Sequence, residues 1–195
     1  MTDLLAEDDG ATPLEHEELE ALIPSYITLR SELNEAEQAG ILEADQWAFS
    51  RRRGDVLDEK FLIDLHRRMF GEVWRWAGSF RRTERNIGVQ AYRIPMDLRQ
   101  LLDNVRYWIE HKTYAPDETA LRFHHGLVAI HPFPNGNGRH ARLAADLLAV
   151  RLDQRRFTWG QGNIAAAGDV RKTYINALRA ADQHDLAPLL AFGRS

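Results

Sequence analysis

The stretch His131-Pro132-Phe133-Pro134-Asn135-Gly136-Asn137-Gly138-Arg139-His140-Ala141-Arg142 decides how the rest of the chain is interpreted, because it separates two segments with helical periodicity. Its two prolines end the first helix, since proline cannot continue the helical hydrogen bonding. Its two glycines permit a backbone that turns successive N–H groups to one side, and the next helix is expected to begin at about Gly138. The unpaired N–H groups and the positive end of that helix predict a place for a polyphosphate.

Charged and polar side chains surround this loop. Arg139 and Arg142 lie three residues apart, on one side of the first helical turn. A neutral His131, at the end of the preceding helix, could take a proton from an incoming hydroxyl. Asn135 could lend its carbonyl oxygen to a phosphate-bound Mg²⁺. Spacing alone leaves a plain helix–helix connection as an alternative, since no Walker-type Gly-Lys-Ser/Thr is present.

The rest of the chain predicts a mainly α domain, a helical bundle with one small β element. Apolar residues at helical spacing predict helices over 25–49, after Asp58, after Pro95, after Asp117, and over 139–152, 164–181 and 186–192. Between Gly78 and Pro95, β-branched and aromatic residues alternate with Arg, Asn and Gly. That composition is typical of short strands and turns, so we expect a small β-hairpin or extended flap there.

Composition limits the classes of protein that this chain can belong to. Its 195 residues suit one domain with a short extension, and 44% apolar with 28% charged residues exclude a wholly disordered chain. The absence of cysteine excludes disulfides, thiolate zinc sites and a thiol nucleophile. A net charge of −4 argues against dedicated nucleic-acid binding, although residues 1–20 are strongly acidic and residues 51–100 are basic. With no long apolar run and no secretory signal, we expect a cytoplasmic protein without a membrane partner.

The loop resembles the signature of the Fic family, His-x-Phe-x-Asp/Glu-Gly-Asn-Gly-Arg-x-x-Arg. The matching residues are His131, Phe133, Gly136, Asn137, Gly138, Arg139 and Arg142. The resemblance covers roughly residues 55–192 and implies an α-helical Fic fold, with a Fic domain over 51–195 and an N-terminal extension over 1–50. Further segments look like the subgroup called mobile mystery protein B, which suggests a toxin-like setting: Phe49-Ser50-Arg51-Arg52-Arg53, Trp74-Arg75-Trp76-Ala77-Gly78 and Asn86-Ile87-Gly88-Val89.

The resemblance implies a protein adenylyltransferase, which transfers AMP from ATP, with Mg²⁺ or Mn²⁺, to a Ser, Thr or Tyr hydroxyl of a target protein. His131 would be the base that deprotonates the hydroxyl. The α- and β-phosphates would be held by backbone and side-chain donors of Gly136, Asn137 and Gly138. Arg139 would contact the phosphates and Arg142 would bind the γ-phosphate.

Three further features follow from the resemblance. Asn135 stands where the family usually has Asp or Glu, and a neutral amide is a weaker Mg²⁺ ligand than a carboxylate. The flap would pair with an extended target segment by strand addition, through Asn86, Ile87, Gly88 and Val89.

Many relatives carry an inhibitory helix with Ser/Thr-x-x-x-Glu-Gly/Asn. Here Ser31 and Glu35 match that pattern, whereas Ala36 departs from it, and an inhibitory Glu35 would lie within ion-pair reach of Arg142.

Three alternatives remain open at this point. A zinc hydrolase is suggested by the crowded His124, His125, His131 and His140, although their spacing differs from that of a helical zinc pair. A Fic-fold phosphotransferase would transfer phosphate instead of AMP. A non-catalytic module would bind nucleotide or a partner and transfer nothing, an alternative motivated by Asn135 and the acidic N-terminus.

Overall fold

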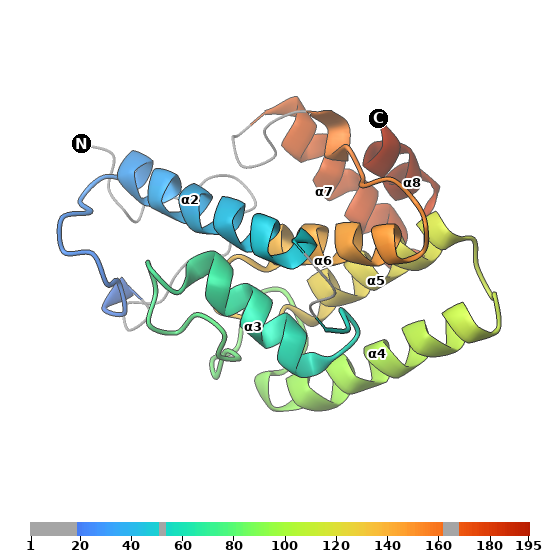
Figure 1. The fold of residues 1–195 in the computed structure, drawn as a ribbon, viewed down its shortest axis with the longest axis horizontal. Helices are drawn as coiled ribbons and strands as arrows, with labels where there is room; N and C mark the ends of the chain where they lie inside the picture. Colours follow the sequence, from blue (N-terminus) through green and yellow to red (C-terminus); the bar gives the residue numbers. More distant parts are fainter. Residues whose placement is uncertain (1–18, 51–53, 162–167) are drawn as a thin grey trace.

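A computed structural model describes residues 19–50, 54–161 and 168–195. These residues form helices α2 (Arg30–Phe49), α3 (Glu59–Phe70), α4 (Ile94–Glu110), α5 (Pro116–Ile130), α6 (Asn137–Arg151), α7 (Asp169–Asp182) and α8 (Ala187–Arg194), with short 3₁₀ turns η1 (Ala91–Arg93) and η2 (Trp159–Gln161). Most of the acidic N-terminal segment and the start of the predicted helix 164–181 lie outside the described residues. The mainly helical architecture is confirmed (Figure 1).

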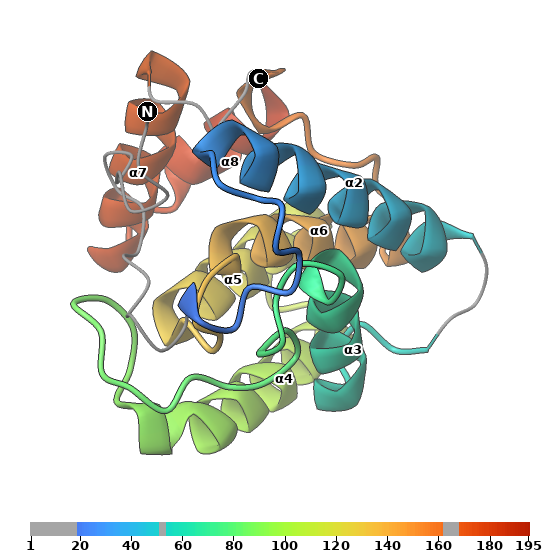
Figure 2. The same ribbon diagram turned by 90° about the vertical axis from the view of Figure 1, so that its left-hand side faces the viewer.

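Helices α5 and α6 occupy the middle of the molecule, with the other helices around them (Figure 2). Helix α5 packs against α6, α4 and α8, and α6 also contacts α3 and α2. Helix α2 in addition packs along α3, and α7 packs against α8. The loop between α5 and α6, residues 131–136, therefore joins the two central helices and is surrounded by residues of several elements.

Local sequence explains where helices α3 and α5 begin. The Asp58 side chain accepts a hydrogen bond from Lys60 N at 2.9 Å, which confirms it as the N-cap of α3. Helix α5 starts two residues earlier than expected, with Ala115 rather than Asp117 as N-cap and Pro116 as first residue. Proline suits that position because its fixed φ is helical and its missing N–H would be unpaired there. Asp117 thus lies inside the first turn, where its charge favours the positive end of the helix.

The expected β-hairpin is not formed. Residues 78–95 contain no strand, and the part of the chain that the structure describes holds just an isolated antiparallel bridge between Leu22 and Trp74. The reason lies in the hydrogen-bond partners. Arg81 N donates to Pro132 O at 2.9 Å and Val89 N donates to Ile130 O at 3.3 Å, so the two sides of this segment bond to the end of α5 rather than to each other. We keep the name flap for residues 81–92.

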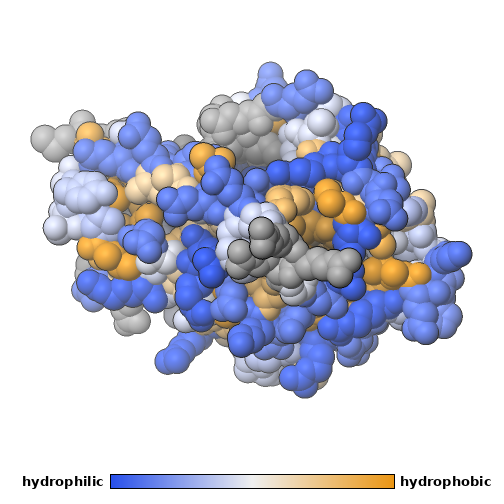
Figure 3. Space-filling view, in the orientation of Figure 1, coloured by the Kyte–Doolittle hydropathy of each residue, from blue (hydrophilic) through white to orange (hydrophobic). Residues whose placement is uncertain are grey.

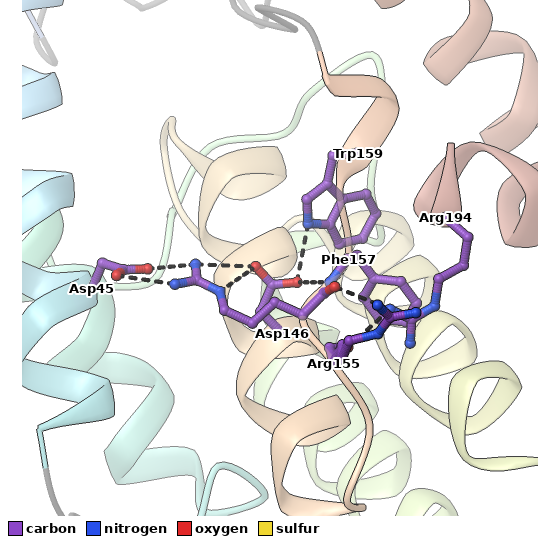
Figure 4. A network of polar contacts seen from close by, with 7 residues as sticks. Asp45, Asp146, Arg155, Phe157, Trp159 and Arg194 are labelled. Carbon is purple, nitrogen blue, oxygen red and sulfur yellow. Dashed lines mark hydrogen bonds and ion pairs between the residues drawn. The ribbon is translucent and has the colours of Figure 1, made fainter.

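An ion network with a buried acid, Asp146, and an exposed arginine, Arg156, joins α2, α6 and η2 (Figure 4). Asp146 of α6 is 4% exposed, and its Oδ1 accepts from Phe157 N and from Trp159 Nε1, both at 3.1 Å. Arg156 lies between Asp146 and Asp45 of α2, at 3.2 Å and 3.1 Å. Burial raises the pKa of the Asp146 carboxyl, whereas the charge of Arg156 acts in the opposite direction. The network fixes α2 against the C-terminal half of α6.

The surface is mixed in character. Figure 3 shows hydrophobic residues as separate patches among hydrophilic ones on the face that it presents. None of the described helices is long and apolar enough to cross a bilayer.

Candidate functional site

The motif loop begins and ends with a left-handed residue. His131 ends α5 with φ of 54°, and Gly136 precedes α6 with φ of 77°. Between them, Phe133 is 1% exposed and stacks on the His66 ring with centroids 3.7 Å apart. The Asn137 amide accepts from Phe133 N at 2.9 Å and donates to Phe133 O at 2.8 Å. These contacts hold the loop in one compact turn.

The Asn137 contacts change the role expected for this residue. Its side chain is 3% exposed, and both ends of its amide are hydrogen-bonded to Phe133. The side chain therefore holds the loop, and its backbone N–H at the first position of α6 is the group suited to a phosphate.

Position 136 requires glycine for two reasons: its left-handed backbone conformation and the lack of room for a side chain. A Cβ at this residue would lie 2.5 Å from the Phe70 ring. At Gly138, by contrast, a Cβ would meet Arg142 at 3.6 Å and the Tyr174 hydroxyl at 3.8 Å, which are ordinary contacts. The absence of a side chain at Gly138 therefore leaves the first turn of α6 open beside Arg142.

His66 of α3 packs against the motif loop. The sequence did not identify it as part of the site. It is fully buried; Gly78 N donates to its Nδ1 at 3.0 Å, and its Nε2 lies 3.0 Å from Asn135 O. Because Nδ1 accepts, the proton is assigned to Nε2 and the ring is neutral. Burial lowers the pKa of His66 well below its usual value, consistent with that assignment.

His131 is held as a neutral base. It is 6% exposed, and burial, followed by the positive charge of Arg81, lowers its pKa to about 4. A neutral imidazole can accept a proton at physiological pH, which is what a general base requires. The side chain that perturbs it, Arg81, was not singled out from the sequence.

The two motif arginines have different neighbours. Arg139 donates to Glu37 Oε2 of α2 at 2.7 Å and lies over the Phe70 ring at 4.8 Å. Glu37 also accepts from Trp74 Nε1 at 2.7 Å and is 5% exposed. Arg142 lies over the Tyr174 ring at 5.3 Å. Each guanidinium is thus placed by a group of another helix.

Tyr174 belongs to the support of Arg142. Its hydroxyl lies 3.0 Å from His124 Nε2, and both residues are buried. Burial raises the pKa of Tyr174, while the nearby charge of Arg142 and a hydrogen bond with it act in the opposite direction. Burial and Arg142 lower the pKa of His124 to about 3. A neutral His124 and Tyr174 therefore line the side of the motif helix that carries Arg142.

The ion pair expected between Glu35 and Arg142 is not formed. Glu35 and Ser31 are exposed, and no ion pair joins Glu35 to Arg142, both of which the structure describes. Glu35 and Glu37 are two positions apart, which places them about 200° apart around the helix. The acid of α2 that faces the protein interior is consequently Glu37 rather than Glu35. The sequence contains a signal for it, since Glu37 lies four residues after Leu33 and three before Gly40, within the apolar stripe.

Asn135 is tied into the loop. Its Oδ1 accepts from Gly136 N at 2.6 Å and from Arg139 at 3.5 Å. An oxygen beside a guanidinium is a weak cation ligand, and Mg²⁺ takes most of its ligands from water and phosphates in such sites. No group of three His, Cys, Asp or Glu residues that could hold a metal occurs among the described residues. The residues fit a single weak protein ligand for a cation that arrives with a nucleotide.

The four histidines suggested for zinc do not converge. His124 contacts Tyr174, His125 contacts Asp182 at 2.7 Å, and His140 contacts Leu62 O at 3.0 Å. These separate partners, with no metal-binding group in the described part of the chain, leave the zinc hydrolase without support.

The flap packs against His131 at Gly88. Asn86, Ile87 and Gly88 are exposed, and Val89 is half-buried. A Cβ at Gly88, where φ is +95°, would lie 2.6 Å from His131 Cβ. The flap backbone is therefore in contact with the candidate base.

Together, the fold and the loop define a helical domain in which a buried neutral imidazole ends one central helix and a glycine-flanked turn with two arginines begins the next. Residues 56–149 match the family model described as the Fic/DOC family, and the chain carries a domain of that family. The family and the helical Fic fold implied by the motif are thus confirmed.

Curated relatives support the same family. The chain is 30% identical over 144 residues to the protein adenylyltransferase Fic of Aedes aegypti, covering 72% of this chain and 28% of that protein. It is 33% identical over 137 residues to the protein of that name from Drosophila melanogaster, covering 68% of this chain and 26% of the relative. The chain thus spans little more than a quarter of the length of these relatives.

Solved structures share the fold. The Fic domain of a Bep effector protein from Bartonella quintana has a TM-score of 0.70 at 16% identity and covers 91% of each chain. BepC from Bartonella tribocorum, solved with bound AMPPNP, has a TM-score of 0.65 at 18% identity and covers 91% of this chain and 96% of that one. Fic-1 from C. elegans has a TM-score of 0.66 at 26% identity, covering 90% of this chain and 51% of its own.

Proposed function

We propose that this protein is an adenylyltransferase that transfers AMP from ATP to a Ser, Thr or Tyr hydroxyl of a target protein. The observation that carries the proposal is the arrangement of the motif loop. A neutral His131 ends α5, and six residues later α6 begins with a glycine-flanked turn and two arginines. The names of the curated relatives and the AMPPNP-bound BepC structure support a nucleotide substrate.

The chemistry assigns a role to each group. The first N–H groups of α6, at Asn137 and Gly138, bind phosphate oxygens, and Arg139 and Arg142 offset the negative charge. His131 accepts the hydroxyl proton as the target oxygen attacks the α-phosphorus. The new bond joins that oxygen to the phosphorus, and pyrophosphate leaves with the electrons of the broken P–O bond. Positioning and charge compensation supply most of the rate, as in other phosphoryl transfers.

A divalent cation enters this proposal with ATP. Mg²⁺ or Mn²⁺ neutralises phosphate charge when bound, and Asn135 Oδ1 is the side-chain oxygen placed to contact it weakly. A reaction that consumes ATP also fits the cytoplasmic location expected from the sequence.

We place the inhibitory element in α2, within an N-terminal extension over residues 1–50 that precedes a Fic domain over 51–195. The Ser31 and Glu35 pattern identified this helix, and the contact between Glu37 and Arg139 favours Glu37 as the acid that competes with phosphate. For target binding we propose strand addition to the flap at Asn86, Ile87, Gly88 and Val89, because three of these residues are exposed. The resemblance to mobile mystery protein B is retained as the subgroup.

The test compares ATP labelled at the α-phosphate with ATP labelled at the γ-phosphate. We expect the wild-type protein with Mg²⁺ or Mn²⁺ to modify itself or an added target with the α-label only, and His131→Ala to lose this transfer while still binding ATP. Transfer of the γ-label would instead identify a phosphotransferase. Binding of ATP without transfer of either label would identify a non-catalytic module.

A further inference from the structure

Arg81 is a buried arginine whose guanidinium is hydrogen-bonded to backbone carbonyls. It is 3% exposed, and its guanidinium donates to four backbone carbonyls. Arginine is rarely buried to this extent unless its donors are satisfied. Two of the four carbonyls belong to the end of α5, and two belong to the flap.

The contacts with α5 reach the candidate base itself. Arg81 Nε donates to His131 O at 2.7 Å, and its NH2 group donates to Ile130 O at 3.4 Å. The last carbonyls of a helix have no partner within the helix, and a cation at that end is favourable to the helix dipole. Arg81 therefore replaces a C-terminal cap at the point where His131 adopts its left-handed conformation, which is costly for a non-glycine residue.

The contacts with the flap come from the same guanidinium. NH1 donates to Thr83 O at 3.0 Å and NH2 donates to Val89 O. These two carbonyls bracket the exposed turn that carries Gly88, whose backbone packs against His131. A Cβ at Gly88 would also lie 2.8 Å from Arg81 NH2. The base, the flap turn and the guanidinium thus form one packed unit.

We propose that Arg81 is a positioning residue that sets the backbone of His131 and locks the flap to it. The inference rests on the proposed function for its catalytic consequence. It does not place Arg81 in contact with substrate. Its effect is on the geometry of the base, so removal of Arg81 is expected to slow the chemical step more than it weakens ATP binding, because the triphosphate groups are held from α6.

The test uses Arg81→Gln and a matched control, Arg194→Gln. Arg194 also donates to two backbone carbonyls, Arg155 O at 2.9 Å and Arg156 O at 3.0 Å (Figure 4). It pairs with Asp117 at the opposite end of α5. Asp117 is 14 residues from His131, about 20 Å along the helix. The control thus removes a comparable set of contacts far from the site.

We expect Arg81→Gln to lower the auto-AMPylation rate at saturating ATP by about tenfold or more, with the half-saturating ATP concentration within about twofold of wild type. Arg194→Gln should change neither value by more than about twofold. A rate for Arg81→Gln that equals wild type, or a loss fully explained by weaker ATP binding, would overturn the proposal.

Arg81→Lys is a second variant, which keeps the positive charge and some hydrogen-bond donors. If Arg81→Gln does not fold, a wild-type rate for Arg81→Lys would count against the proposal, and a reduced rate with unchanged ATP affinity would support it.

Amide hydrogen exchange provides a readout that does not depend on activity. Exchange over residues 83–89 and 128–133 should accelerate in Arg81→Gln and stay unchanged in Arg194→Gln. If wild-type protein transfers no AMP, the proposed function fails while this exchange measurement still decides the positioning role. Equal protection of both segments in the two variants would reject that role.

Discussion

At the scale of single residues, two glycines of one motif have different reasons to be glycine. Gly136 combines a positive φ with a close approach to Phe70, so the fold requires it. Gly138 has a helical place in α6 and room for a methyl group. The fold does not exclude a side chain there, so the proposed nucleotide site is the reason we give for this glycine: a Cβ would stand beside the N–H groups and Arg142.

We therefore expect Gly136→Ala to destabilise the protein by about 3 kcal/mol, from its left-handed backbone and overpacking against Phe70. Gly138→Ala should keep wild-type stability, since alanine even favours a helix, but should weaken binding of a non-hydrolysable ATP analogue by about tenfold or more. Urea denaturation and calorimetric titration measure the two effects. Equal losses of stability in both variants would refute the distinction.

A second residue-scale prediction concerns Asn135. Aspartate there would bring a full charge to an oxygen that already lies near Gly136 N and Arg139. Because carboxylates bind Mg²⁺ more strongly than amides, Asn135→Asp should lower the Mg²⁺ concentration that gives half-maximal auto-AMPylation several-fold.

The control for this variant is Asn104→Asp on α4, which adds the same charge at an exposed position whose amide contacts Gln100. It should leave the Mg²⁺ dependence unchanged. An identical Mg²⁺ dependence of Asn135→Asp and wild type would argue against cation contact at this residue.

At the scale of elements, α2 is attached to the motif helix at two points. Glu37 pairs with Arg139 near the start of α6, and Asp45 joins Asp146 through Arg156 about two turns further on. From the first contact to the second, the residue number increases on both helices. Helices α2 and α6 therefore run roughly parallel along this interface. The helix that carries the proposed inhibitory acid is thus packed into the domain itself.

We expect Glu37→Gln to raise auto-AMPylation several-fold, because it removes the charge that holds Arg139 while its amide oxygen can still accept from Trp74 Nε1. Glu35→Gln is the matched control and should behave as wild type, since Glu35 is exposed. Initial rates at subsaturating ATP provide the measurement. A lower rate in Glu37→Gln would mean that Glu37 holds Arg139 in a productive position.

The sequence predicts local elements better than contacts between elements. Asp58 and the prolines after His131 mark helix ends through short-range chemistry, and the structure places those ends within a few residues of expectation. The flap was expected as a hairpin because its composition favours strands. Its backbone partners, Ile130 and Pro132, are about 40 to 50 residues away, and no local pattern encodes that pairing.

The candidate site shows the same division. The motif predicted the candidate base, the glycines and both arginines, because their spacing is local. Supporting residues such as His66, Arg81 and Tyr174 come from other elements, and their roles depend on three-dimensional packing. Glu37 falls between these two groups. Its position within an apolar stripe can be seen in the sequence, whereas its pairing with Arg139 cannot.

At the scale of the whole molecule, four buried neutral histidines make stability depend on pH. The pKa of His124 is lowered to about 3, those of His131 and His140 to about 4, and that of His66 also falls well below 6.5, in each case mainly by burial. The unfolded chain binds protons on these rings below about pH 6.5, whereas the folded protein does not until about pH 4. Stability is therefore full at neutral pH and falls as pH decreases through this window.

We expect the free energy of unfolding to fall between pH 7 and pH 5, with each such histidine contributing up to about 2 kcal/mol. His131→Gln should reduce this loss by about that amount, and His111→Gln, at an exposed position, should not. Urea titrations at the two pH values give the comparison. A loss in His131→Gln as large as in wild type would show that this ring does not contribute.

One aromatic ring has consequences for how the family can diverge. Phe70 contacts the bare backbone of Gly136 on one side and carries the guanidinium of Arg139 on another. A smaller residue at position 70 would leave a cavity beside Gly136 and would also remove the ring that contacts the Arg139 guanidinium. A substitution at position 136 alone, or at position 139 alone, would therefore compensate for only one of the two losses. Among homologous chains, we expect positions 70, 136 and 139 to be inherited as a set, with substitutions at one accompanied by substitutions at the others.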